Sequence, residues 1–490
     1  MPQNEASNAS VSNEIYQLLP SLNDLLLSPI FGSLLLSSPR SAVVGLTRIA
    51  LDQLREEISN GFHTRASLID QVALLPSRVA TALSRESQFS LRAVINATGV
   101  ILHTNLGRAP LSRSALERLV DVAKGYSNLE LDLASGERSS RGVHVEALIL
   151  KVIGRTGTRI PDDYSTTVVN NCAAATFLAL NALAAGRDVI ISRGELVEIG
   201  GGFRIPEILE KSGATLKEVG TTNRTRLADY ENALSANTGM IMRVHQSNFS
   251  MEGFIERPTL EDLVALGKRH AVPVFEDQGT GLILPLEQYG INGEATLSEC
   301  LKQDCDLMAA SGDKLLGGPQ CGILIGRKEL IDRIKQSPLF RAFRVDKLTL
   351  GALEGTLVDY LADDPGLIPI VRMLNIPPVE ILRRCEWIKA RIDNADLSVE
   401  IVPVTSLIGG GTTPKAGVRG FALSLAHSQM KGTALALALR RAETPVIGRI
   451  VDDRILLDLR TVDPYSDPRL LAAIHEQLPA TQPRAETSGA

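Results

Sequence analysis

The chain has 490 residues, of which 44% are apolar and 22% are charged, and its 51 basic and 56 acidic residues leave a formal net charge of −5. This composition excludes a disordered, collagen-like or coiled-coil protein, and the length predicts two or three domains. The acidic balance argues against a general coat for nucleic acid or anionic membrane, and we expect no DNA partner, although a local basic site is still allowed.

Cysteine usage and the N-terminal sequence indicate the compartment. The five cysteines are scattered and form neither C-x-x-C nor zinc-type spacing, so we expect no disulfide framework and no metal. The first residues lack the basic and apolar regions of a signal peptide, and the leucine-rich stretch 19–36 is interrupted by Pro20, Asp24 and Pro29. We therefore expect a soluble, cytoplasmic protein without a membrane partner.

The N-terminal quarter of the chain has a helical pattern. Residues 1–12 are polar and without periodicity, which predicts a disordered tail. Apolar residues then recur at three- and four-residue spacing to about residue 90. We predict a small helical domain over 13–68 and a linker helix over 69–92.

Strands and helices alternate over residues 93–349. Short β-branched runs lie at 168–171, 188–193, 215–220, 239–245, 272–277, 306–311 and 322–326, with amphipathic stretches between them. This alternation predicts an α/β core with a mainly parallel sheet covered by helices on both faces. A different mixture of helical and strand-like segments follows over 350–480, where we predict a small α+β domain. We predict a loose tail over 481–490.

The segment SGDKLLGGPQCG (311–322) carries the most specific chemistry. Lys314 directly follows a predicted strand, and the carboxyl ends of strands are where open α/β sheets bind ligands. A P-loop is excluded because leucine follows the lysine. We interpret Lys314 as a Schiff-base lysine for pyridoxal phosphate (PLP), with the Ser311 hydroxyl near the cofactor phosphate. An isolated S-x-x-K is more often a surface turn.

Three further features support that interpretation. Asp277 ends a strand 37 residues before the lysine and could keep a pyridine nitrogen protonated, although an aspartate that caps a turn is common. His245 ends the preceding strand and could contact the ring, although a lone histidine is usually structural. The turn Asn171, Cys172, Ala173 opens a helix whose N–H groups could bind phosphate, and tight packing explains it equally well. Their order along the chain is typical of a fold-type-I PLP enzyme.

Long motifs then identify a family. The chain resembles the bacterial selenocysteine synthases, the L-seryl-tRNA(Sec) selenium transferases, from about residue 19 to about residue 462. After Asp277 the chain reads DQGTG where the family pattern is DLGSG, a departure that keeps the carboxylate and the glycines. The resemblance is carried by INATGVILHTNLGRAPL (95–111), GYSNLELDLASGERSSRG (125–142), GELVEIGGGFRIPEI (194–208), VGTTNRTRLADY (219–230), VHQSNFSMEGF (244–254), SGDKLLGGPQCGILIG (311–326), FRAFRVDKLTL (340–350) and GRIVDDRILLDLRTV (448–462).

The resemblance implies the reaction and several roles. It implies an aspartate aminotransferase-like fold, Lys314 as the PLP lysine, Asp277 as the pyridinium partner and Asp313 as an active-site acid. The tRNA-bound serine would lose its Cα proton and hydroxyl to give an aminoacrylyl-tRNA, to which selenophosphate adds selenium. The freed Lys314 amine is the expected base.

Arginines are the expected ligands of the selenium donor, because guanidinium groups bind phosphate oxygens in pairs. Arg341 and Arg344 are three residues apart and would share one face of a helix, and Arg108 is a third candidate. The family's anion-binding arginines match these three. Arg138 and Arg141 are further candidates that the sequence does not place.

Binding of tRNA is less evident from the residues themselves. Residues 1–92 hold seven arginines, no lysine and eight acidic residues, a weak electrostatic footprint for RNA. The family nevertheless uses this region to bind tRNA(Sec), and its members assemble as a pentamer of dimers, so we expect a homo-oligomer. Two alternatives stay open: a PLP-dependent lyase acting on a free amino acid or amino-sugar acid, and a non-catalytic tRNA-binding protein.

Overall fold

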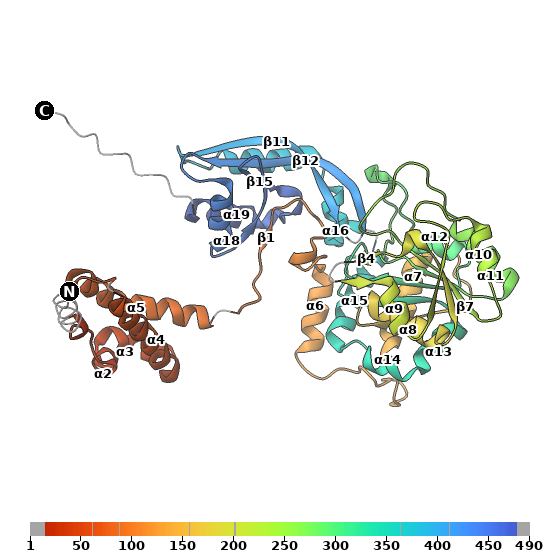
Figure 1. Cartoon of the computed structure of the whole chain (residues 1–490), viewed down its shortest axis with the longest axis horizontal. Coiled ribbons are helices and arrows are strands. Elements are labelled where there is room, and N and C mark those ends of the chain that lie inside the picture. The colour runs from red at the N-terminus through yellow and green to blue at the C-terminus, as the bar shows by residue number, and fades with distance from the viewer. Residues whose placement is uncertain are drawn as a thin grey trace, which may run out of the picture. The chain divides into compact units, whose positions relative to one another are not determined.

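The computed structural model describes residues 15–477 except 61, 88, 156, 200–201, 363 and 411. The tails predicted at 1–12 and 481–490 lie outside these residues. The chain forms two compact units that divide between Ala93 and Val94 (Figure 1). Among the described helices, none has the length and apolar character needed to cross a membrane.

The regular elements in the described part of the smaller unit are helices joined by short turns. Its core contains Phe31, Leu51, Leu54, Leu68 and Leu75, all of which are almost fully buried. Leu68 and Leu75 lie on one continuous helix that passes the predicted boundary at 68/69, so the predicted linker helix contributes to this core over its described part. The helices are α2 (Leu22–Leu27), α3 (Pro29–Ser37), α4 (Arg40–Ser59) and α5 (Arg65–Ser87).

The larger unit is built on a seven-stranded sheet. Its spatial order is β2-β10-β9-β8-β7-β3-β6, and all neighbours are parallel except β10, which is antiparallel to both β2 and β9. The strands are β2 (Tyr164–Val169), β3 (Asp188–Ser192), β6 (Thr215–Val219), β7 (Thr238–Val244), β8 (Val274–Asp277), β9 (Leu307–Ser311) and β10 (Gly322–Arg327).

Helices cover both faces of this sheet because its strands are apolar on both sides. In β7, for example, Ile241 faces one hydrophobic cluster while Met240 and Met242 face the other. The first cluster is formed with α7 (Glu146–Gly154), α10 (Leu227–Ala233), α11 (Leu260–His270), α12 (Leu297–Lys302) and α15 (Lys347–Leu361), and the second with α8 (Cys172–Ala184), α9 (Ile205–Lys211) and α13 (Lys328–Gln336).

A four-stranded antiparallel sheet with helices forms the C-terminal part of this unit (Figure 1). Its order is β11-β12-β15-β14, and the short parallel pair β1–β13 connects the start of the unit to it. The elements are β1 (Ile95–Asn96), β11 (Leu397–Gly409), β12 (Thr413–His427), β13 (Val446–Ile447), β14 (Arg449–Val451), β15 (Arg454–Asp458), α16 (Pro369–Asn375), α17 (Pro378–Lys389), α18 (Gly432–Arg441) and α19 (Asp467–Gln477).

The predicted fold class is therefore confirmed: a mainly parallel α/β sheet with a small α+β part after it. The predicted boundary at 349/350 falls inside α15, which packs on α6 (Arg113–Ala123). Short connecting elements complete the unit: α14 (Pro338–Ala342) and the hairpin β4 (Glu198–Ile199) and β5 (Phe203–Arg204).

Candidate active site

A cavity of about 480 Å³ lies at the carboxyl ends of β2, β7, β8 and β9. We call it the lysine cavity, because Lys314 lines it. Parallel strands bring their carboxyl ends to one edge of a sheet, which is why residues far apart in the sequence meet here. Its lining residues are Thr104, Gly107, Arg108, Asn171, Cys172, Ala173, Ile199, Val244, His245, Ser247, Asp277, Gly279, Ser311, Asp313, Lys314 and Gln320.

Lys314 is buried in the turn that follows β9, at 6% exposure. The turn is held by its backbone: Gly317 N–H donates to the Lys314 carbonyl, and Leu315 N–H donates to the Thr280 carbonyl, both at 2.9 Å. The lysine amine itself forms no hydrogen bond or ion pair with any described residue. Lys314 lines the cavity, where its charge acts on the nearby carboxyl group of Asp277.

Asp277 ends β8, and its carboxylate is buried in the same cavity. The Thr176 hydroxyl donates to Oδ2 at 3.2 Å, and the Cys172 thiol lies 3.6 Å from Oδ1. Burial raises the pKa of Asp277, while the charge of Lys314 and the Thr176 hydrogen bond act in the opposite direction. A second cation beside Asp277, such as a protonated ring nitrogen, would stabilise the ionised carboxylate.

The first turn of α8 forms another wall. Asn171 caps this helix, its side chain accepting from Ala174 N–H at 2.8 Å. Cys172 and Ala173 line the cavity as the first helical residues, whose N–H groups have no acceptor within the helix. Gly322 of β10 packs on this turn so closely that a Cβ there would lie 2.1 Å from the Asn171 carbonyl oxygen.

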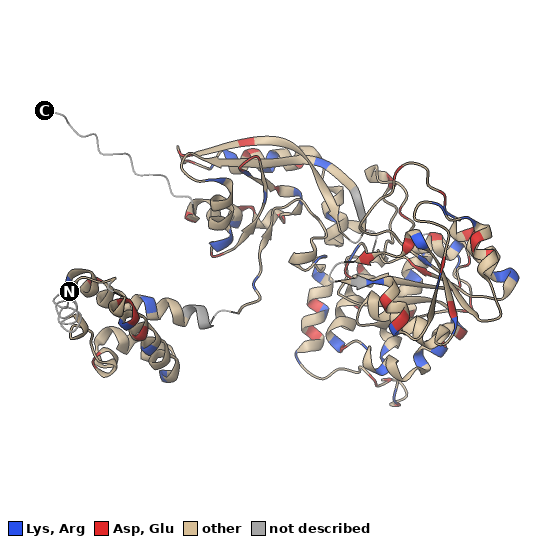
Figure 2. Cartoon of the chain, viewed as in Figure 1, with Lys and Arg blue, Asp and Glu red and all other residues tan. Residues whose placement is uncertain are grey.

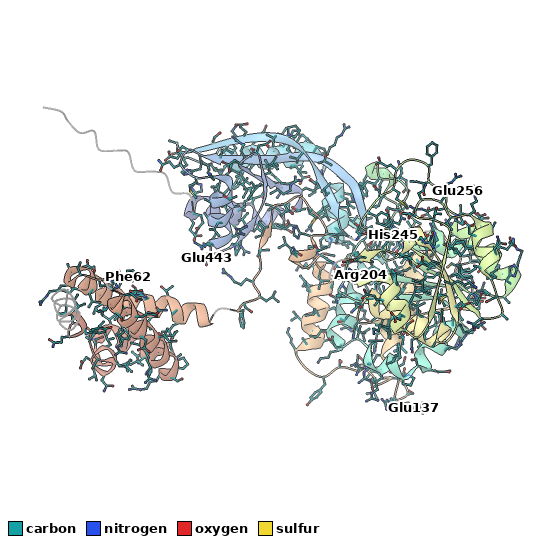
Figure 3. The ribbon with its side chains drawn as sticks, viewed as in Figure 1. Phe62, Glu137, Arg204, His245, Glu256 and Glu443 are labelled. Atoms are coloured by element: carbon teal, nitrogen blue, oxygen red, sulfur yellow. The ribbon has the colours of Figure 1, made fainter. Side chains whose placement is uncertain are left out.

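His245 and Ser311 complete the predicted cofactor set. His245 follows β7 and is labelled in Figure 3. Its backbone N–H donates to the Asp277 carbonyl at 3.0 Å, and its side chain lines the lysine cavity. Ser311 is the last residue of β9 and is buried on the same side.

Asp313 and Arg108 also line this cavity, where they form an ion pair. Arg108 Nη1 lies 2.8 Å from Asp313 Oδ2, and Ala109 N–H reaches the Asp313 carbonyl at 3.3 Å. Arg108 has a positive φ of 61°, in the left-handed region that non-glycine residues rarely adopt. The guanidinium expected to bind an anion is thus already paired with the predicted acid.

The structure separates Arg341 and Arg344 from this group. They line a different cavity, of about 460 Å³, which we call the arginine cavity. The prediction that they share a helical face is wrong: α14 ends at Ala342, and Arg344 forms a β-bridge with Val169. Phe343, which follows the helix, accepts a backbone hydrogen bond from Asn170 N–H at 2.9 Å, so the chain turns away from helical geometry.

The arginine cavity also contains Arg138 and Arg141, which the sequence did not place. Three of its arginines surround Glu130: Arg141 Nε lies 2.7 Å, Arg138 Nη2 3.1 Å and Arg344 Nη1 3.6 Å from its oxygens. Arg141, and after it Arg138, hold the pKa of Glu130 below its usual range. Arg341 has no ion-pair partner among the described residues.

Sequence reasoning missed two contacts of the cofactor set. Thr176 could have been found, because it lies four residues after Cys172 and therefore on the same face of α8. Glu294 approaches His245, with Oε2 2.9 Å from Nε2. It lies in an irregular loop 49 residues further along the chain, where no periodicity could reveal it.

Comparisons with known proteins show the family to which the chain is similar. The L-seryl-tRNA selenium transferase family model matches residues 94–463. L-seryl-tRNA(Sec) selenium transferase of Geobacter metallireducens is 44% identical over 89% of this chain and 93% of its own length. The proteins of the same name from Geobacter sulfurreducens and Aquifex aeolicus are both 42% identical, over 94% and 86% of this chain and 99% and 91% of their own lengths.

A solved structure shares the fold. D-glucosaminate-6-phosphate ammonia-lyase superposes with a TM-score of 0.54 at 17% identity, covering 79% of this chain and 96% of that one. At this identity the likeness concerns the fold alone. The family model covers most of the larger unit, and the relatives extend the match over nearly the whole chain. The chain belongs to the L-seryl-tRNA selenium transferase family.

Proposed function

We propose that this chain converts L-seryl-tRNA(Sec) to L-selenocysteinyl-tRNA(Sec), using PLP in the lysine cavity and selenophosphate as the selenium donor. One observation carries the proposal: Lys314 and Asp277 occupy one buried cavity in a chain whose relatives of this name match it over nearly its full length. A non-catalytic scaffold would have no need to keep a lysine and a carboxylate together in a buried cavity.

The residues of the lysine cavity fit PLP. The Lys314 amine would hold the cofactor's aldehyde carbon, Asp277 its ring nitrogen, and the first turn of α8 with Ser311 its phosphate. When bound, PLP supplies an electron sink for the negative charge that develops at the substrate Cα. The buried carboxylate of Asp277, further held by Thr176, suits a protonated ring nitrogen.

Protein groups would then handle protons and water. Lys314 would take the Cα proton of the bound serine, and its being the only lysine that lines the described cavity supports this role. Asp313, oriented by Arg108, is the acidic residue nearest to it in sequence and would accept a hydrogen bond from the serine hydroxyl, holding it for departure. The burial of Lys314 and Asp313 limits access of bulk water.

Selenophosphate would be bound by Arg341, Arg344 and Arg108. Arg341 supports this role most directly, because its guanidinium is unpaired among the described residues while it lines the arginine cavity. Arg344 is 3.6 Å from Glu130, a distance from which it could turn to a phosphate oxygen. Arg108 would join them from the lysine cavity.

The helical unit would bind the body of the tRNA by shape. Figure 2 shows basic and acidic positions interspersed along the ribbons of α4 and α5. This distribution supports binding in which a few arginines, such as Arg40, Arg48 and Arg65, contact the phosphates and 2′-hydroxyls of the tRNA backbone. Arg55 pairs with Asp52 and is a weaker candidate. We also propose a homo-oligomer, a pentamer of dimers as in the family, and a cytoplasmic location, where aminoacylated tRNA is used.

The decisive experiment supplies the purified, PLP-loaded chain with seryl-tRNA(Sec) and selenophosphate, and with free serine as a competitor. We expect selenocysteine on the tRNA and unchanged free serine. Conversion of free serine, without conversion on the tRNA, would contradict the proposal and favour a small-molecule lyase. Thiophosphate in place of selenophosphate then tests the identity of the donor.

A further inference from the structure

His245 separates the lysine cavity from a third cavity, of about 580 Å³. Val244 and His245 are the residues that line both, and His245 is the titratable one of the two. We call this third space the glutamate cavity, because Glu195, Glu276 and Glu294 line it. Contacts of the His245 imidazole in the glutamate cavity therefore determine how the ring is oriented in the lysine cavity.

The imidazole has few polar restraints. Its Nδ1 is buried and forms no hydrogen bond with the described residues, so the contact at Nε2 is the one that can orient the ring. Nε2 lies 2.9 Å from Oε2 of Glu294, whose side chain is 13% exposed. The two groups form a close ion pair without the geometry of a hydrogen bond, and no other described group makes a hydrogen bond to that carboxylate oxygen.

Other charged groups near His245 are already engaged. Glu276 is paired with Arg243, with Nη1 3.1 Å from Oε1, and Asp277 accepts from Thr176. Both carboxylates interact electrostatically with His245, but neither forms an ion pair with it. Glu294 is therefore the carboxylate that the described structure leaves to position this ring.

The loop that carries Glu294 is anchored to the cofactor site by Gln278. Gln278 Nε2 donates to the Ala295 carbonyl at 2.9 Å, while its Oε1 accepts from Gly281 N–H at 2.8 Å. The connection forms a closed circuit: Asp277 is bonded to Gln278, Gln278 holds Ala295, Glu294 contacts His245, and the His245 backbone returns to Asp277. Gln278 is the residue that departs from the leucine of the family pattern.

We propose that Glu294 is a positioning residue that orients His245 against PLP, and that Gln278 holds the Glu294 loop for this purpose. The inference rests on the proposed cofactor site. A carboxylate behind a histidine sets the orientation and tautomer of its ring, so removing it should weaken cofactor binding through the ring and not through the fold.

A double-mutant cycle on PLP affinity tests this, because it isolates an effect that passes through one partner. We expect Glu294→Ala to lower PLP affinity about tenfold in the otherwise unchanged chain and less than about twofold in a His245→Asn background. Glu294→Gln, which keeps an oxygen of the same reach beside Nε2, should restore affinity to within about threefold of the original. PLP absorbance during titration of the cofactor-free protein is the measurement.

Two variants refine the test. Glu287→Ala removes a negative charge from an exposed position upstream in the same connection and should leave the affinity unchanged. Gln278→Leu should lower affinity by a smaller factor than Glu294→Ala, and again only while His245 is present. If Glu294→Ala does not fold, Glu294→Asp withdraws the carboxylate by one methylene and answers the same question.

The outcomes are separable. Equal losses with and without His245, or a folded Glu294→Ala protein with unchanged affinity, would overturn the inference while leaving the proposed function intact. An original chain that binds no PLP would overturn both. A loss of PLP affinity that occurs only when His245 is present establishes the positioning role of Glu294.

Discussion

The lysine cavity and the arginine cavity differ in how the charged side chains that line them are paired. In the first, the Lys314 amine has no hydrogen bond or ion pair among the described residues and burial raises the pKa of Asp277, while Arg108 and Asp313 pair with each other. In the second, Glu130 is surrounded by three arginines and its pKa is lowered. The first cavity is therefore prepared for a ligand that completes its charges, whereas the second holds cations around a counter-ion that an incoming anion must displace.

The largest effect is expected from Lys314→Ala in the lysine cavity. If the amine holds the cofactor and moves the Cα proton, the substitution should reduce turnover by at least about 1,000-fold and abolish the absorbance of lysine-bound PLP. Turnover on seryl-tRNA(Sec) and an absorbance scan measure the two effects. Retained turnover with the original spectrum would remove Lys314 from the site.

Arg341→Ala addresses the arginine cavity. Losing one charge-assisted contact to phosphate should raise the KM for selenophosphate about 10- to 100-fold, with little change in tRNA affinity. Initial rates at varied donor concentration provide the measurement. Arg113→Ala, which removes an exposed arginine paired only with Glu117, is the matched control. An unchanged KM would separate this cavity from the donor.

Glu130→Gln tests the arginine cavity from the other direction, because it should improve the binding of selenophosphate. At neutral pH Glu130 is ionised, because its pKa lies below the usual range, so its charge competes with an incoming anion. Removing it should lower the KM for selenophosphate about threefold, a small effect because the pair is exposed to solvent. A raised KM would instead show that Glu130 positions the arginines, and this would contradict the competition argument.

Asp277→Asn tests the lysine cavity through the thermal stability of the protein. Because the folded pKa is raised, the folded state binds a proton more readily than the unfolded state, and ionisation at higher pH costs stability. The substitution should therefore raise the melting temperature of the cofactor-free protein by about 1–2 °C at pH 8, and less near pH 4, while turnover falls. Calorimetry at both pH values is the check, and a lower melting temperature at pH 8 would contradict it.

How far the sequence predicts this molecule depends on whether a feature follows from local pattern. The strand runs at 188–193 and 306–311 match β3 and β9 closely, and strand-end logic placed Lys314 and Asp277 in one cavity. Apolar alternation encodes burial, but it does not encode strand order. The antiparallel insertion of β10 between β2 and β9 was therefore not predictable.

The arginines show why local spacing can mislead. Spacing of three places two residues on one face only while the helix continues, and α14 stops at Ala342 before Arg344 is reached. Backbone pairing of Asn170 with Phe343 decides that end, and this is a contact between segments more than 170 residues apart. The contact between Glu294 and His245 likewise arises from the tertiary structure.

The close packing of Gly322 on the Asn171 turn has a consequence for genetics. The same glycine pairs with Val169 on one side and with Ser311 on the other, so it joins the strands that lead to both turns of the proposed cofactor site. A single added methyl group would push these walls apart. In a screen for inactive alleles, substitutions at Gly322 would therefore be classed with cofactor-binding defects, although this residue does not line the lysine cavity.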